Sequence, residues 1–521
     1  MGAVPFPSLR SNILRVFAPG RPDKHYVVAL IAASSAFILL AGAARHYLAY
    51  GTETDFVGAF VQEARRFLQG APLHSVYHPP LYSIVIGVAY LITSDWLRAG
   101  LLVSWISGVV ALVASFLLFK ELFNRAAGFG ALLGLLGSGL FVLHWGLATS
   151  DVFFLAGFMV SCLLAVKAFR SGSMAVWAAC GIAAGLCFLT RTNAISLAVL
   201  VIAPLLSAGS ARAKVRSVLA LVGGMALPVA TLATYAAVTG SNLFPAGTHV
   251  SLAITYFAEG ARNTDDARRE AAARFTNLRE VLLHDPAAIA KTYVSGLYHL
   301  LANGITRLIE VPLYYAILPG AIYLIAVYFS PALLVLAGVV LSQVLLVNLI
   351  FFQQRLYLFL VPWLGAAVGE TFRRIADAPW PKSARPAVIG FLALVWLLAS
   401  VQAGAKTVHM LSHGGEDELS EVVPLTRGKI RPGSVILAYK PHVAFYNGAT
   451  TESLPDLDGL AQLKKYTQER AGTGALYIFY GMIERLRRPQ YAELARGTPP
   501  PWLEVTARSR KAGGWVLLSV K

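Results

Sequence analysis

The sequence predicts an α-helical polytopic membrane protein that carries a C-terminal α/β domain outside the membrane. Of its 521 residues, 56% are hydrophobic and only 14% are charged, whereas soluble domains carry about 25% charged residues. Several apolar stretches are also longer than the roughly 18 residues that a transmembrane helix needs. They include residues 100–119, 126–143 and 331–352. This composition excludes an ordinary soluble enzyme.

We expect eleven spans and one further apolar stretch that is too short to cross comfortably. The short stretch covers residues 80–92, and runs of about 10–14 residues are more often re-entrant or interfacial. Counting it as a span would give twelve. The eleven expected spans lie near residues 26–44, 97–119, 127–147, 152–169, 174–190, 193–208, 218–238, 311–328, 331–350, 355–370 and 387–404.

Basic residues between the spans orient the chain. If residues 80–92 do not cross, every basic cluster falls on the side of the N-terminal arm, in agreement with the positive-inside tendency. We therefore expect a cytoplasmic N-terminus, an uncleaved first span, external loops at residues 45–96 and 239–310, and an external tail. The clusters are Lys120 and Arg125, Lys167 and Arg170, Arg212, Lys214 and Arg216, and Arg373, Arg374, Lys382 and Arg385.

The formal net charge of +17 does not indicate a nucleic-acid partner. The positive charge lies between hydrophobic spans, and no long polar segment carries a basic stripe interleaved with aromatic residues. The cysteines Cys162, Cys180 and Cys187 lie inside apolar runs, where a thiol most often behaves as a small core residue. A disulfide scaffold is therefore excluded.

The long external loop contains two helical patterns. In residues 264–283, apolar residues from Ala267 to Leu282 recur at helical spacing, which is typical of a helix that lies on a membrane face. This helix is expected to end at His284. Asp285 and Pro286 then predict the cap and first position of a second helix that runs towards Gly304.

The chain divides into an expected transmembrane module, residues 1–404, and a soluble extracytoplasmic domain, residues 405–521. In the tail, apolar β-rich runs alternate with helical patterns between Gly and Pro residues, which indicates a small α/β domain. The expected strands cover residues 434–438, 475–480 and 515–520, and the expected helices lie around residues 457–470 and 482–495.

Scarce acidic residues converge on the external face of this topology. Asp55 follows the first span, with Glu53 close by, and Asp151 occupies the second external turn. Two prolines after His78 fix an extended backbone near the membrane interface. Each residue also has a purely structural alternative: Asp55 could cap the following helix, Asp151 could cap the span after it, and His78 could be an interfacial ring.

Six segments carry a family resemblance: the acidic residue after the first span, His78-Pro79-Pro80-Leu81-Tyr82, and residues 119–123, 185–191, 355–362 and 439–446. Their order resembles the GT-C glycosyltransferases, and most closely the group of protein mannosyltransferases and lipid A aminoarabinose transferases. The resemblance covers most of the chain. One departure concerns the acidic pair, which is adjacent in the family, whereas here Phe56 follows Asp55 and Glu53 lies two positions before it.

The resemblance implies a GT-C fold and transfer of a sugar from a polyprenyl-phosphate donor to an external glycan, lipid or protein acceptor. It places the enzyme in a bacterial inner membrane and leaves open mannose, arabinose, galacturonic acid and aminoarabinose. Asp55 is the expected general base of an inverting reaction. Glu53, His78 and Asp151 are expected to support it, Tyr77 and Tyr82 to bind substrate, and Arg191, Arg307 and Arg355 to bind the donor phosphate.

Several alternatives stay open. A divalent metal held by Asp55, Asp151 and His78 is one, since oxygen and imidazole ligands suit several ions. The arginines could instead be interface anchors. A lipid or solute transporter is a rival function, although transporters tend to carry ionisable residues deep in their spans, and here the charges gather at the span ends. A non-catalytic lipid-binding scaffold with the same fold is the second rival.

Overall fold

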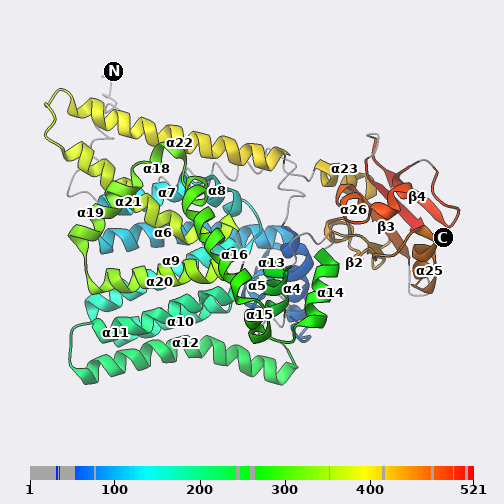
Figure 1. The fold of residues 1–521 in the computed structure, drawn as a ribbon, viewed down its shortest axis with the longest axis horizontal. Helices are drawn as coiled ribbons and strands as arrows, with labels where there is room; N and C mark the ends of the chain where they lie inside the picture. The colour runs from blue at the N-terminus through cyan, green and yellow to red at the C-terminus, as the bar shows by residue number, and fades with distance from the viewer. Residues whose placement is uncertain are drawn as a thin grey trace, which may run out of the picture.

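The computed structural model describes residues 53–74, 78–241, 247–257, 264–350, 353–413, 417–470, 475–496, 498–510 and 514–521, together with residues 28, 31, 32 and 35. Most of the expected first span, near residues 26–44, lies outside these residues. Figure 1 shows three layers: long helices that run side by side, a group of short helices at one end of them, and a β-sheet beyond that group. We call the end with the short helices the loop end.

The long helices form a polytopic membrane protein, as predicted. In the described part of the chain, six helices are long and apolar enough to cross a membrane, or seven if one bent pair counts as a span. The expected number of eleven is therefore not reached by this criterion. The six are α6 (Trp96–Leu122), α9 (Ser150–Ser171), α12 (Ala211–Thr239), α18 and α19 (Val311–Tyr314 and Ile317–Tyr328), α20 (Pro331–Ile350) and α22 (Arg385–His413).

The expected span at residues 127–147 is broken into two helices. The chain forms α7 (Arg125–Leu136) and α8 (Gly139–Trp145), which meet at an angle of 67°. Gly137 ends α7, and the Ser138 hydroxyl accepts a hydrogen bond from the Phe141 N–H at 3.4 Å, so it caps α8. A side-chain cap replaces the backbone hydrogen bonds that would have continued the helix.

The expected span at residues 193–208 is built mainly from a 3-10 helix. Residues Thr192–Val201 form η2, and Ile202–Leu206 form α11. Because a 3-10 helix rises about 2.0 Å per residue, these two pieces together reach roughly 28 Å, close to the ~30 Å of a hydrocarbon core. A second 3-10 segment, η4 (Gln354–Leu360), leads into α21 (Val361–Asp377).

Glycines allow the closest helix contacts in the bundle. A Cβ added to Gly130 on α7 would lie 2.3 Å from the carbonyl oxygen of Gly365 on α21, so only glycine fits there. Such close backbone approach is how small residues stabilise helix pairs in membranes. At the end of this pair opposite the loop end, the Asn124 side chain donates to the buried Glu370 carboxylate at 2.8 Å. The three cysteines are buried and unpaired, as expected.

Short helices cover the loop end. The first loop forms the π-helical turn η1 (Phe56–Phe60) and α4 (Val61–Leu68), and the short apolar stretch forms α5 (Leu81–Thr93). Figure 1 places α4 and α5 beside one another at this end. Tyr82 on α5 packs against the ring of Phe60, with 4.8 Å between their centroids. With only 13 residues, α5 fails the length criterion for a span.

The long loop differs from the expectation of one membrane-facing helix at residues 264–283. It forms α13 (Thr248–Phe257), α14 (Thr264–Arg274) and α15 (Leu278–His284), because Asn277 caps α15 through a 3.0 Å hydrogen bond from the Glu280 N–H. Ala271 and Phe275 are buried against protein in a cluster with α13, which explains the apolar face. Asp285 does cap α16 (Pro286–His299), which continues as η3 (Leu300–Gly304).

The tail forms a five-stranded sheet in the order β2-β1-β3-β5-β4. Strand β1 runs parallel to β2 and β3, whereas β5 pairs antiparallel with both β3 and β4. The expected strands correspond to β1 (Val435–Leu437), β3 (Leu476–Tyr480) and β5 (Val516–Val520). The sequence prediction missed β2 (Thr450–Glu452) and β4 (Leu503–Arg508). The domain boundary expected at residue 404 falls inside α22.

Candidate active site

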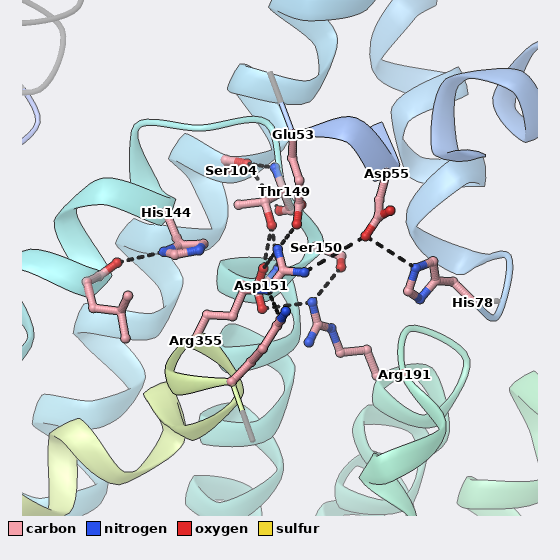
Figure 2. A network of polar contacts seen from close by, with 12 residues as sticks. Glu53, Asp55, His78, Ser104, His144, Thr149, Ser150, Asp151, Arg191 and Arg355 are labelled. Atoms are coloured by element: carbon pink, nitrogen blue, oxygen red, sulfur yellow. Dashed lines mark hydrogen bonds and ion pairs between the residues drawn. The ribbon is translucent and has the colours of Figure 1, made fainter. Parts of the chain in front are cut away.

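Asp55 lies at the start of η1, at the loop end. It occupies the N-cap position, but its side chain makes no capping hydrogen bond. Asp55 therefore does not serve as a side-chain cap of the following helix. Its carboxylate instead faces His78, whose Nε2 lies 3.9 Å from Asp55 Oδ2 (Figure 2). The His78 ring stacks on Phe60, with 4.9 Å between the ring centroids. Packing on η1 therefore orients the imidazole towards Asp55.

Asp151 lies in the first turn of α9, and it is Thr149 that caps this helix. The Thr149 hydroxyl accepts from the Asp151 N–H at 3.3 Å and donates to Asp151 Oδ2 at 2.5 Å. Ser104 on α6 lies 3.4 Å from the Thr149 backbone. The Asp151 side chain is only 1% exposed. A buried carboxylate needs partners of opposite charge.

Two arginines supply that charge. Arg191, just before η2, places Nη2 at 2.8 Å from Asp151 Oδ1 and donates to the Ser150 hydroxyl at 3.0 Å. Arg355 on η4 forms an ion pair with Glu53, and its Nη1 lies 3.8 Å from Asp151 Oδ2. Figure 2 shows the two guanidinium groups beside Asp151, each extending from a different segment of the chain. We call Glu53, Asp55, Asp151, Arg191 and Arg355 the charged network.

The three carboxylates of the charged network differ in accessibility. The Asp151 side chain is 1% exposed, that of Glu53 17% and that of Asp55 45%. The contact with His78 is the largest cause that lowers the pKa of Asp55 below its ordinary value. Burial raises this pKa, and the charges of Arg191 and Lys440 lower it further. Asp55 is therefore an accessible, ionised carboxylate beside two partly buried arginines.

Two other candidate residues, Arg307 and Tyr82, are not members of the charged network. Arg307 on α17 (Ile305–Leu308) is exposed, and it forms no ion pair with the residues that the structure describes. Tyr82 is fully buried between Phe60 and Phe153, so its ring packs in the core of the loop end in this conformation. Tyr77 lies outside the described residues.

The metal site that the sequence left open, with Asp55, Asp151 and His78 as ligands, is not assembled among the described residues. Across the described ranges, no three His, Cys, Asp or Glu side chains are grouped closely enough to hold a metal ion. Asp55 and His78 face one another, but Asp151 is occupied by Thr149 and two arginines, whose positive charge opposes a bound cation. The residues present do not fit the three-ligand site.

Sequence reasoning missed the polar residues that support the network. Thr149 and Ser150 directly precede Asp151, so their position was a usable signal. The third missed residue, Lys440, comes from the tail domain, and its Nζ donates to the Thr54 hydroxyl at 2.7 Å. Its segment entered the sequence prediction only as part of a family resemblance, because nothing in the local pattern places it near the first loop.

Comparisons with known proteins agree with this fold. Residues 77–236 match the family model of dolichyl-phosphate-mannose-protein mannosyltransferases. The structure is similar to that of ArnT from Cupriavidus metallidurans bound to undecaprenyl phosphate, with a TM-score of 0.60 and 14% identity over 94% of this chain and 97% of ArnT. The apo state of ArnT gives a TM-score of 0.55 and 14% identity over 96% and 98%.

An archaeal protein shares the fold as well. The apo oligosaccharyltransferase from Archaeoglobus fulgidus gives a TM-score of 0.51 and 13% identity over 89% of this chain and 70% of its own. A sequence search of curated proteins gives no match. The chain therefore shares its fold with ArnT and with the archaeal oligosaccharyltransferase. The match to the mannosyltransferase family model over residues 77–236 and the structural similarity to ArnT confirm the predicted resemblance.

Proposed function

We propose that the protein transfers a sugar from a polyprenyl-phosphate donor to an extracytoplasmic acceptor with inversion at the anomeric carbon, and that Asp55 is the general base. One observation carries this proposal. In the charged network, Asp55 is the most exposed carboxylate, at 45% side-chain exposure against 17% for Glu53, whereas Asp151 is enclosed by arginines. An acceptor can therefore approach Asp55 but not Asp151.

The chemistry needs one such base. A sugar or protein hydroxyl is a poor nucleophile, and a carboxylate within hydrogen-bond reach takes its proton as the hydroxyl oxygen attacks the anomeric carbon. Because the bond to the donor phosphate breaks in the same displacement, no covalent enzyme intermediate is required. The lowered pKa of Asp55 keeps its carboxylate ready to accept a proton at neutral pH.

The leaving group is a lipid phosphate, and arginine is suited to stabilise it. Guanidinium groups bind phosphate oxygens through paired, charge-assisted hydrogen bonds. The Arg355 side chain is 24% exposed and that of Arg191 12%, so Arg355 is the better candidate for direct contact. Asp151 and Glu53 then orient the two cations before the donor arrives, which supports electrostatic stabilisation of the developing charge.

The carrier and its membrane follow from the same reasoning. ArnT was solved with undecaprenyl phosphate, and a carrier of this kind suits a site at the end of a helical bundle in a lipid bilayer. We propose a bacterial inner-membrane enzyme with a cytoplasmic N-terminus, whose loop end and tail domain face the extracytoplasmic side. The acceptor is a glycan, a glycolipid or a protein.

Sugar release from purified protein tests the proposal. The protein is incubated with candidate polyprenyl-phosphate sugars, with and without a chelator, and the products are read by mass spectrometry. Loss of the sugar from the carrier supports the proposal, and loss that persists with chelator supports a metal-independent step. A transporter would leave every donor intact.

A matched pair of variants separates catalysis from fold. Asp55→Asn should stop release, whereas Asp458→Asn, at an exposed position in the tail domain, should not change it. Equal release by both variants would show that Asp55 is not the base, whereas the non-catalytic scaffold predicts no release by either variant or by wild type.

A further inference from the structure

The tail domain makes a specific contact with the segment that carries Asp55. The Lys440 ammonium donates to the Thr54 hydroxyl at 2.7 Å, and Thr54 lies between Glu53 and Asp55 in the chain. Next to this contact, a Cβ added to Gly58 on η1 would lie 3.3 Å from Cγ of Pro441. Figure 1 shows the sheet domain at the loop end of the bundle. The two parts of the chain therefore meet at the candidate active site.

Apolar packing supports the polar contact. Phe445 on α24 (His442–Tyr446) packs against a buried cluster that includes Phe56 and Phe60 of η1. A contact made by both a charged group and an aromatic ring constrains the approach of α24 to η1 more than either does alone. Docking at this point fixes where Lys440 lies relative to Asp55.

The turn that presents Lys440 is anchored inside its own domain. It follows β1 directly, and the carboxylate of Glu484 accepts hydrogen bonds from the Tyr439 N–H at 2.8 Å and the Gly481 N–H at 3.0 Å. Glu484 is only 1% exposed, and burial raises its pKa. A buried carboxylate that accepts backbone hydrogen bonds holds the turn in one conformation.

Charge also favours a role at the site. The charged network contains three carboxylates and two arginines, so one further cation brings it towards balance. The Lys440 charge is one of the causes that lower the pKa of Asp55. Lysine is a compact cation on a flexible stem, which suits contact with a neighbouring domain at the edge of a site.

We propose that Lys440 is a positioning residue of the active site, which holds the Glu53–Asp55 segment through Thr54 and makes the tail domain part of the catalytic unit. The proposal rests on the proposed function, because positioning matters only if Asp55 takes part in the reaction. The competing view is a tail domain that is merely tethered to α22 and recruits acceptors independently of the site.

Kinetics of Lys440 variants test the positioning role. Lys440→Met should lower kcat by roughly tenfold to a hundredfold with little change in KM for the donor, since a small displacement of a reacting group has effects of this size. Lys440→Arg should restore most of the activity, because it keeps the cation. Lys465→Met, at an exposed position on α25 (Leu460–Arg470), is the matched control and should behave as wild type.

Two results would overturn the positioning role. One is a Lys440→Met enzyme with the kcat of wild type. The other is a Lys440→Arg enzyme as impaired as Lys440→Met while both melt at the wild-type temperature, because a cationic contact should tolerate this exchange.

A cross-link tests the docking without any activity. A Gly58→Cys/Pro441→Cys double variant should form a disulfide, because a Cβ at position 58 would lie 3.3 Å from the Cγ atom of Pro441, which is near the position of a cysteine sulfur. Oxidation by copper phenanthroline and air should link the two peptides, as read by mass spectrometry. A Gly58→Cys/Lys465→Cys pair should stay unlinked. The native cysteines are buried and should not interfere.

The two experiments separate two kinds of failure. If wild type releases no sugar from any donor but the cross-link forms, the proposed function fails and the docking stands. If wild type is active but the cross-link does not form, the inference about Lys440 and the tail domain is wrong.

Discussion

Arg355 forms an ion pair with Glu53, and so connects a 3-10 helix late in the chain to the first loop. The same guanidinium lies 3.9 Å from Asp55 Oδ2 and 3.8 Å from Asp151 Oδ2. One side chain therefore contacts all three carboxylates of the charged network. Neutralising it should disturb both the donor phosphate and the placement of Asp55.

Arg355→Ala should weaken binding of the carrier phosphate. Loss of a charge-assisted hydrogen bond costs about 1.5–3 kcal/mol, which corresponds to roughly a tenfold to hundredfold higher Kd. Binding of undecaprenyl phosphate to purified protein measures the effect. Arg307→Ala is the control, because Arg307 lies exposed on α17, apart from the network. Unchanged affinity in Arg355→Ala would remove Arg355 from the phosphate site.

Asp151→Ala should destabilise the protein, unlike changes at Asp55. Its carboxylate is 1% exposed and pairs with Arg191 at 2.8 Å, and removing one partner of a buried pair costs about 3–5 kcal/mol. The melting temperature should therefore fall together with activity. Asp55→Asn changes a half-exposed group and should leave the melting temperature close to wild type. An Asp151→Ala protein that melts like wild type would show that this pair does not stabilise the fold.

His78→Ala should shift the pH dependence of the reaction. Asp55 accepts a proton only when ionised, and contact with His78 is the largest cause that lowers its pKa. Without the imidazole, the pKa of Asp55 rises, so the acid limb of kcat/KM moves to higher pH. Profiles between about pH 4 and pH 7, where carboxyl groups titrate, compare the variant with wild type. An acid limb of kcat/KM that moves to lower pH or stays in place would show that His78 does not lower the pKa of Asp55.

Glu418→Gln should stabilise the tail domain above neutral pH. Glu418 lies on α23 (Asp417–Thr426). Its burial is the largest cause that raises its pKa from 4.5 to about 7. The folded state therefore holds this proton more tightly than the unfolded state, and stability is lost as pH rises from 4.5 through about 7. Glutamine is neutral throughout, so its advantage in melting temperature should be seen at pH values above 7 and vanish near pH 4. A gain in melting temperature that is equal near pH 4 and above pH 7 would show that titration of Glu418 does not cause it.

Much of the candidate site could be predicted because loop positions alternate between the two sides of a membrane. That parity placed Asp55, Asp151, Arg191 and Arg355 on one face, and the structure brings these four together. The alternation of loops predicts on which side of the membrane a residue lies, but not where it lies within that face. Arg307 therefore shared the predicted face and yet lies outside the charged network.

The features that the sequence did not predict depend on individual hydrogen bonds and on contacts between distant segments. Neither of these leaves a periodic pattern in the sequence. Hydropathy alone does not distinguish an α-helix from the 3-10 segment η2, nor does it show that Ser138 caps a new helix after Gly137. The contact between Lys440 and Thr54 joins two regions whose local patterns carry no trace of each other. The presence of the helices could be predicted from composition. The breaks within helices and the contacts between domains are seen only in the structure.

Turnover of a polyprenyl-phosphate sugar by Asp55→Asn is the most direct measurement. The amide keeps the shape of the side chain but accepts a proton poorly, so turnover should fall roughly a hundredfold to ten-thousandfold. Melting temperature and binding of undecaprenyl phosphate should stay at their wild-type values. Wild-type turnover in this variant would show that Asp55 is not the base.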